Sequence, residues 1–157
     1  MIYSRSAEHA IRALVHLAGL GPGRQVLAKT LAADAKIPAP YLSRILQDLA
    51  RAGFLKSTKG PGGGFRFIGP TEEITLLRIV EAVDGAGVYE KCPYGEPECT
   101  PRALCGMHGS WNAARSGIIE YLATTSIASL AKALSEKRRV IARARKRSEQ
   151  RTAGSHA

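Results

Sequence analysis

The chain has 157 residues, enough for one globular domain plus an extension, and its formal net charge is +10. It contains no long uninterrupted apolar run and no signal-like start, so we expect a soluble, cytoplasmic protein with no membrane partner. An odd number of cysteines argues against a disulfide framework and favours reduced thiols that bind a metal or react.

The charge is unevenly distributed along the chain. Residues 1–68 carry ten Lys and Arg against three Asp and Glu, and residues 136–157 carry eight against two. Residues 69–135 are acidic, with five basic side chains against eight acidic ones. A basic module joined to an acidic one fits a protein that binds nucleic acid with the first and senses or dimerises with the second. A solvated basic surface would fit the charge equally well.

Helical periodicity predicts three helices in the first third of the chain, at about 6–20, 26–35 and 40–52. Ser4 or Ser6 is the expected N-cap of the first helix. Pro40 falls in the first turn of the third, and Gly53 follows its end, as expected for the residue after a helix C-terminus. The apolar stripe of the third helix leaves its other face polar.

A glycine-rich hairpin follows the third helix. Its strands are the apolar–aromatic runs at 54–55 and 65–68, and its tip is flanked by basic residues. The order of helix, helix, turn, helix and basic hairpin is that of a winged helix-turn-helix, which binds duplex DNA with the third helix in the major groove and the wing on the adjacent backbone or minor groove. The expected DNA-binding residues are Tyr41, Ser43, Arg44 and Gln47 on the third helix and Lys59, Gly62, Gly63 and Arg66 in the wing.

The wing glycines have two other interpretations. They could form only a flexible hairpin turn, whereas in a wing they would let backbone N–H groups approach phosphates. A nucleotide-binding loop is weakly supported, because no lysine–serine or lysine–threonine pair follows the glycines and the next element is a strand.

The second half of the chain is also predicted to be helical. Short helices fit 74–83 and 126–134, and a longer one fits about 110–123, where Trp111, Ala114 and Ile118 recur at helical spacing. This longer helix could be buried within the monomer or paired with a second copy. A homodimer fits DNA reading, because two half-sites need two recognition helices. The basic end of the chain is expected to be disordered, or to become helical on a polyanion.

The predicted fold is therefore mostly α with a small β-hairpin wing and a long dimerisation helix. Four segments divide it: a winged helix-turn-helix at 1–84, a cysteine loop at 85–109, dimerisation helices at 110–134 and a basic, disordered tail at 135–157.

The loop carries the candidate metal ligands Cys92, Cys99, Cys105 and His108. Six, five and two residues separate successive ligands, and the intervening segments are rich in proline and glycine. Thiolates select zinc, copper(I) or iron–sulfur clusters. Zinc fingers usually pair their ligands closely, and only Cys105 and His108 are so close. The wider spacing therefore favours a cluster, while a structural zinc site and a redox disulfide switch among the three cysteines stay open.

An enzyme is the least expected class of protein. None of the four histidines has an evident carboxylate partner or nucleophile, and no cofactor fingerprint is present.

Several segments together resemble the bacterial winged-helix regulators typified by IscR and NsrR. They are Ser4 with the 7–17 helix, Pro40-Tyr41-Leu42, the wing from Lys59 to Phe65, and the cysteine triplet after the helix that contains Ile79 to Val83. The resemblance covers roughly residues 1–134. It implies a homodimeric transcription factor that holds an iron–sulfur cluster on three cysteines and one further ligand, and whose cluster state changes its preferred DNA sites.

The resemblance also suggests the fourth ligand. Members similar to IscR bind [2Fe–2S] with a histidine just after the third cysteine, a position that His108 matches. Members similar to NsrR bind [4Fe–4S] with a carboxylate near the N-terminus of the partner subunit, a position that Glu8 matches. We favour His108 and [2Fe–2S]. Glu8 could instead form an i,i+4 pair with Arg12, and His108 could be a loop residue without a ligand role.

Two positions depart from the pattern. Lys59 stands where the wing usually has an arginine, and lysine lacks planar bidentate hydrogen bonding. The interval from Cys92 to Cys99 is one residue longer than the commonest spacing, a difference that a loop can absorb.

Overall fold

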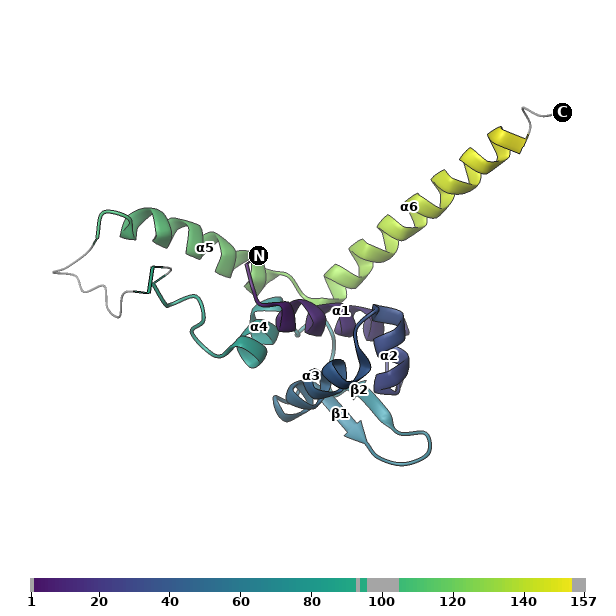
Figure 1. The fold of residues 1–157 in the computed structure, drawn as a ribbon, viewed down its shortest axis with the longest axis horizontal. Helices are drawn as coiled ribbons and strands as arrows, with labels where there is room; N and C mark the ends of the chain where they lie inside the picture. The colour runs from purple at the N-terminus through teal and green to yellow at the C-terminus, as the bar shows by residue number, and fades with distance from the viewer. Residues whose placement is uncertain (1, 93, 96–104, 154–157) are drawn as a thin grey trace.

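The computed structural model describes residues 2–92, 94–95 and 105–153, with side chains up to residue 145. Within these residues the fold is helical with one antiparallel hairpin, which confirms the predicted class (Figure 1). The elements in chain order are α1 (Arg5–Gly19), α2 (Ala28–Ala35), α3 (Ala39–Arg51), β1 (Leu55–Thr58), β2 (Gly64–Phe67), α4 (Leu76–Asp84), α5 (His108–Thr124) and α6 (Ile127–Ala153).

Helix α1 lies at the centre of the core. Its side chains at Ala7, Ala10, Leu14 and Leu17 are almost fully buried, and it packs against α2, α3, α4 and α6. Burying each leucine contributes roughly 1.5–3 kcal/mol to folding. The helix begins after Ser4, whose Oγ accepts a hydrogen bond from the Ala7 N–H at 3.1 Å, so of the two predicted caps Ser4 is the one used.

Helices α2 and α3 form the helix-turn-helix. The chain leaves α2 at Lys36, which has the left-handed φ of 54°, and the N–H of Ile37 bonds back to Ala32 at 2.9 Å. This C-terminal motif satisfies the last carbonyls of α2 and turns the chain sharply. Helix α3 then buries one stripe against the core, made of Leu42, Ile45, Leu46 and Leu49. The opposite face of α3 is consequently directed outward.

The hairpin is joined to the body by a third segment. Strand β1 pairs antiparallel with β2, Leu55 opposite Phe67 and Thr58 opposite Gly64. Val26, just before α2, adds two backbone hydrogen bonds with Phe65, at 3.0 and 2.8 Å. The wing is thereby fixed to the helix-turn-helix.

Replacing Gly64 with alanine is expected to destabilise the fold by about 1–3 kcal/mol. Gly64 has a φ of +133°, and a Cβ there would lie 2.3 Å from the Val26 carbonyl oxygen. Urea unfolding followed by circular dichroism measures the change. Gly69→Ala is the matched control, because a Cβ at Gly69 meets nothing within 4 Å, and it should change stability by less than about 0.5 kcal/mol. Equal stabilities for the two variants would contradict the close approach of Val26.

Helices α4, α5 and α6 close the body on the other side of α1. The Leu76 N–H bonds to Thr125 at 2.9 Å and the Ile127 N–H bonds to Ile74 at 2.8 Å, so the start of α4 pairs with the α5–α6 connection. Only the C-terminal end of α5 is buried in the body, through Leu122, and the rest of the helix projects outward (Figure 1). Among the described residues no helix combines the length and apolar character needed to span a bilayer.

Helix α6 corrects one prediction. We expected a short helix ending near Leu134 and a tail that is disordered or becomes helical on a polyanion, whereas α6 continues to Ala153. Residues 127–153 contain no glycine or proline and are rich in Ala, Arg, Lys and Glu, which have high intrinsic helix propensity. The expectation followed apolar periodicity, which fades after Leu134 although the propensity for helix does not. The other helix bounds differ from the predictions by one or two residues.

Candidate nucleic-acid interface and metal centre

The outer face of α3 presents exposed polar side chains at Tyr41, Arg44, Gln47 and Arg51. They are held outward because the buried stripe of α3 faces the core. Arg51, further along the helix, forms an ion pair with Asp48 on the next turn back. Arginine and glutamine are the residues that pair with guanine and adenine edges in the major groove. Arg44 and Gln47 are thus placed to read bases.

The other two predicted contacts on α3 are engaged within the protein. Ser43 is half-buried, and its Oγ donates to the Ala39 carbonyl at 2.8 Å. The Tyr41 hydroxyl hydrogen-bonds with Ser6 Oγ at 2.5 Å, and its ring meets the edge of His9 with centroids 5.4 Å apart. These contacts favour positioning roles for Tyr41 and Ser43. Ser6 and His9 were not predicted, because nothing in the pattern of α1 indicates which face of α3 it meets.

The wing concentrates positive charge. Lys56 lies directly opposite Arg66 in the hairpin register, and Lys59 is exposed at the start of the turn. Like charges directly opposite each other across strands are destabilising. An anion beside the pair would remove that cost, which is the situation a DNA phosphate creates. The positions predicted for Lys59 and Arg66 therefore suit backbone contacts.

The glycines of the tip have structural tasks. Gly62 has a φ of +75°, and its carbonyl accepts a hydrogen bond from Gln25 Nε2 at 2.6 Å. Gly63 is buried, its N–H donates to the Gly60 carbonyl at 2.9 Å, and a Cβ there would lie 2.4 Å from the Thr58 carbonyl oxygen. The Gly63 N–H is consequently used inside the turn, unlike the free phosphate donor we expected. Gln25, which braces the tip, carries no sequence signal that would have identified it.

Helix α3 and the wing form one surface. An open depression between α3 and β1 is lined by Gln47, Ala50, Arg51, Leu55 and Ser57. It lies between the outer face of α3 and the cationic hairpin. A duplex can therefore contact both elements at once.

The candidate metal ligands are only partly described. Cys92 is half-buried and Cys105 is exposed, and both are free thiols, whereas Cys99 lies outside the described residues. His108 is the first residue of α5, and its backbone N–H donates to the Cys105 carbonyl at 3.1 Å. Cys105 and His108 are therefore one turn apart. No group of three or more His, Cys, Asp or Glu in the described part of the chain is close enough to hold a metal ion.

The alternative ligand, Glu8, lies in the first turn of α1. Its carboxylate forms an ion pair with Arg12 at 3.5 Å, the i,i+4 pair that we gave as its other interpretation. Arg12 also donates to the Ala35 carbonyl at 2.5 Å. Within one chain, Glu8 thus has a partner of its own.

A buried donor without a partner lies next to the cysteine loop. Trp111 Nε1 is buried and has no hydrogen-bond partner among the residues that the structure describes. Trp111 follows His108 by three residues and so lies on the same side of α5. An unsatisfied buried N–H costs about 1–3 kcal/mol, and N–H groups near an iron–sulfur centre stabilise its sulfurs. With free thiols at both ends of the loop, this environment fits a thiolate-bound metal centre.

A helix-turn-helix joined to a cationic hairpin defines a winged-helix DNA-binding regulator. The profile of the Rrf2 family, described as an iron-dependent transcriptional regulator, matches residues 3–133. The chain belongs to the Rrf2 family.

Similar proteins agree with this assignment. An HTH-type transcriptional regulator of Aquifex aeolicus is 33% identical over 132 residues, which cover 83% of this chain and 91% of that protein. The regulator IscR of Vibrio campbellii is 26% identical over 132 residues, 84% of this chain and 78% of that protein. The structure of CymR, the global cysteine regulator of B. subtilis, shares the fold with a TM-score of 0.68 and 22% identity, over 82% of this chain and 95% of that chain.

Proposed function

We propose that the chain is a homodimeric, iron–sulfur-cluster-sensing transcriptional regulator that acts in the cytoplasm, and that its cluster state controls its affinity for promoter DNA. The observation that carries the proposal is the pair of free thiols, Cys92 and Cys105, at the two ends of one loop, with His108 one turn beyond. The similarity to an IscR supports the same function.

The proposed ligands are Cys92, Cys99, Cys105 and His108, with [2Fe–2S] preferred over [4Fe–4S] and Glu8 as the alternative fourth ligand. When bound, the cluster supplies a centre that responds to redox state or nitric oxide. Thiolates hold metal firmly, whereas a single imidazole is released by protonation or oxidation. His108 begins α5, so loss of its bond would free the N-terminal end of that helix.

Dimerisation is proposed to use α5. This helix projects from the body (Figure 1). Its residue Tyr121 is 51% exposed, and Trp111 and Ile119 are only half-buried. A second copy covers these apolar groups and places two α3 helices on two half-sites. Sedimentation equilibrium should give the mass of two chains.

Wild-type protein purified without oxygen tests the proposal. It should be coloured, contain iron and labile sulfide, and bind a promoter fragment with an affinity that changes when the cluster is removed. About one zinc per chain without sulfide would select a structural zinc site. A defined disulfide under peroxide, with full activity in metal-free protein, would select a thiol switch, the second candidate that the free thiols support.

Neutralising the wing should weaken DNA binding for every sequence. In Lys56→Gln/Arg66→Gln, the slope of log affinity against log salt is expected to fall in magnitude by about 1.8, because each lost phosphate contact removes about 0.9. Fluorescence anisotropy over a salt series measures the slope. The matched control is Lys91→Gln/Lys132→Gln, which removes two exposed charges outside the interface and should leave the slope unchanged. Equal slopes in both variants would exclude the wing from the interface.

The basic part of α6, after Leu134, is expected to add DNA affinity that does not depend on the base sequence. Arg139 and Arg143 are exposed like charges at i,i+4, which destabilise a free helix, and a polyanion removes the repulsion. Figure 1 shows α6 leaving the body away from the hairpin, so it would contact a different stretch of DNA from α3.

Truncation after Leu134 should therefore weaken binding to long duplexes equally for all sequences and reduce its salt dependence. Truncation after Ala153, which removes no Lys or Arg, should change neither property. Gel shifts on short and long duplexes compare the three proteins. Undiminished binding after the longer truncation would rule out a role for the tail.

A further inference from the structure

We propose that Ser6, Asp84 and Tyr89 are positioning residues that connect the cysteine loop to the recognition helix α3 through the N-terminal end of α1. The inference rests on the proposed function only for the event that displaces the loop, a change in the cluster. The contacts themselves lie within one chain and do not depend on it. It names the route by which a change at the loop would reach the base-reading face.

The first link joins the start of the cysteine loop to residues 2–4, which precede α1. Tyr89, three residues before Cys92, donates its hydroxyl to the Ile2 carbonyl at 2.6 Å. Asp84, the last residue of α4, accepts hydrogen bonds from both the N–H of Ser4, at 3.0 Å, and the hydroxyl of Ser4. Two groups from the α4 end of the loop therefore hold the residues that precede α1.

The same serine begins α1. Ser4 Oγ accepts from the Ala7 N–H at 3.1 Å while its hydroxyl proton goes to Asp84. The Asp84 carboxylate is thereby held near the N-terminus of α1 through the capping residue Ser4, a position that the helix dipole also favours for a negative charge. A displacement of Asp84 removes the fixed orientation of the cap and loosens the first turn of α1.

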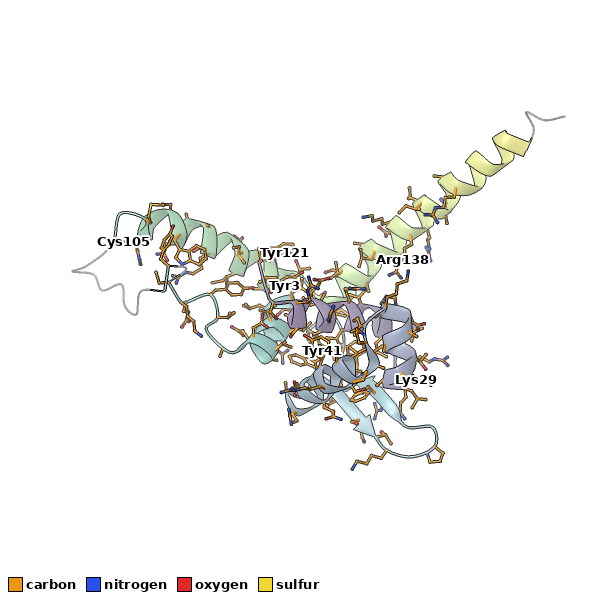
Figure 2. All side chains as sticks on the ribbon, viewed as in Figure 1. Tyr3, Lys29, Tyr41, Cys105, Tyr121 and Arg138 are labelled. Atoms are coloured by element: carbon orange, nitrogen blue, oxygen red, sulfur yellow. The ribbon has the colours of Figure 1, made fainter. Side chains whose placement is uncertain are left out.

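The Tyr89 hydroxyl is suited to remain a hydrogen-bond donor to the Ile2 carbonyl. Burial, followed by the nearby Asp84 and Tyr3, raises the pKa of the Tyr89 phenol above its usual value, so the hydroxyl keeps its proton. Tyr3 packs on the core and lies near Tyr121 of α5, where the two are labelled in Figure 2. Residues 2–4 therefore contact Asp84 and Tyr89 on one side and lie near α5 through Tyr3.

The second link joins α1 to α3. Ser6, two residues after the cap, hydrogen-bonds through Oγ with the Tyr41 hydroxyl at 2.5 Å. Tyr41 lies in the first turn of α3, and its ring rests against the edge of His9. The Nδ1 atom of His9 is buried and has no hydrogen-bond partner among the described residues. The first turns of α1 and α3 are consequently held together.

These hydrogen bonds act on α1, whose side chains at Ala7 and Ala10 are fully buried, and a densely packed interior passes a displacement on because it cannot absorb it locally. When the loop pulls on Tyr89 and Asp84, residues 2–4 shift, the first turn of α1 follows, and Ser6 carries Tyr41 with it. Arg44 lies one turn after Tyr41, on the face that reads bases. The coupling is reciprocal, so DNA that fixes α3 also favours the clamped arrangement of the loop.

A double-mutant cycle tests the connection without any reference to a cluster. Tyr89→Phe and Ser6→Ala each remove one hydroxyl, and each should weaken operator binding by about two- to tenfold. If the two residues act along one route, the operator affinity of the double variant should equal that of the single variant with the lower affinity. Independent sites that share no partner would instead multiply their effects.

Tyr94→Phe is the matched control. Tyr94 is two residues after Cys92 and 63% exposed, so its variant should leave operator affinity unchanged, alone and on top of Ser6→Ala. Multiplying effects for Tyr89→Phe and Ser6→Ala, or no effect of Tyr89→Phe, would overturn the inference.

A second measurement separates this inference from the proposed function. The ratio of operator affinities for cluster-loaded and cluster-free protein should move toward one in Tyr89→Phe, while the iron content stays at the wild-type level. Loss of iron from Tyr89→Phe would overturn the inference, because Tyr89 would then support the metal site itself. If wild-type protein carries no cluster, the proposed function fails, and the double-mutant cycle still decides whether the connection exists.

Discussion

Replacing Arg44 with alanine is expected to weaken binding to the operator by about 1–3 kcal/mol and to relax the sequence preference at one base pair. Arg44 is exposed on α3, and its neighbours Leu42, Ile45 and Leu46 are buried, so its side chain points away from the core. A guanidinium in the major groove makes two parallel hydrogen bonds to guanine, and alanine makes none. Competition binding on a set of single-base operator variants measures both effects.

The comparison within the same helix is Arg51→Ala. Arg51 has the same charge but is already paired with Asp48, so its loss should affect all DNA sequences alike and by less than Arg44→Ala. If Arg44→Ala changed neither affinity nor preference, α3 would not be the element in the major groove.

Replacing Cys105 with serine is expected to abolish iron and labile sulfide binding and to remove the cluster's effect on DNA affinity. Cys105 ends the cysteine loop one turn before His108, and it is the exposed thiol of the described pair. A serine hydroxyl stays protonated at neutral pH and does not replace a thiolate as a ligand for iron. Iron and sulfide assays on anaerobic protein, with visible absorption, measure the loss.

Met107→Ser is the control for this variant, because Met107 is an exposed sulfur-containing side chain in the same turn and is no proposed ligand. It should keep full iron content. Retention of iron by Cys105→Ser would refute the proposed ligand set.

The fourth ligand is decided by two further variants. His108→Ala should change the Mössbauer and resonance Raman spectra of the cluster, whereas Glu8→Ala should leave them unchanged, because Glu8 is already paired with Arg12. The opposite result would favour [4Fe–4S] with a carboxylate ligand.

Local patterns predicted most of the fold. The apolar stripe of α3, the cap at Ser4 and the turn glycine at Gly53 all depend on interactions within a few residues, and each is where the pattern indicated. The predicted end of α6 was wrong because apolar periodicity indicates packing and not intrinsic helix propensity. The basic part of α6 is helical through its intrinsic propensity.

The site was predictable only in its residue types. The sequence indicated a polar outer face on α3 and a basic wing, yet it could not show that Ser43 bonds to Ala39 or that the Gly63 N–H is used inside the turn. Both details depend on backbone groups whose partners are chosen by exact geometry, which residue identity does not record. Because these groups are engaged within the protein, Arg44 and Gln47 are the residues of α3 that we expect to contact bases.

By itself, the sequence determined a basic winged helix-turn-helix followed by a loop with three cysteines, because helix period, turn glycines and ligand spacing are all local quantities. Only the tertiary structure shows that residues at the start of the loop and a residue of α3 both hydrogen-bond to residues at the N-terminal end of α1. That link depends on pairs of residues 87, 80 and 35 positions apart, Tyr89 with Ile2, Asp84 with Ser4 and Tyr41 with Ser6. Such pairs meet because the buried faces of α1, α3 and α4 pack around one core, and no short-range pattern specifies them.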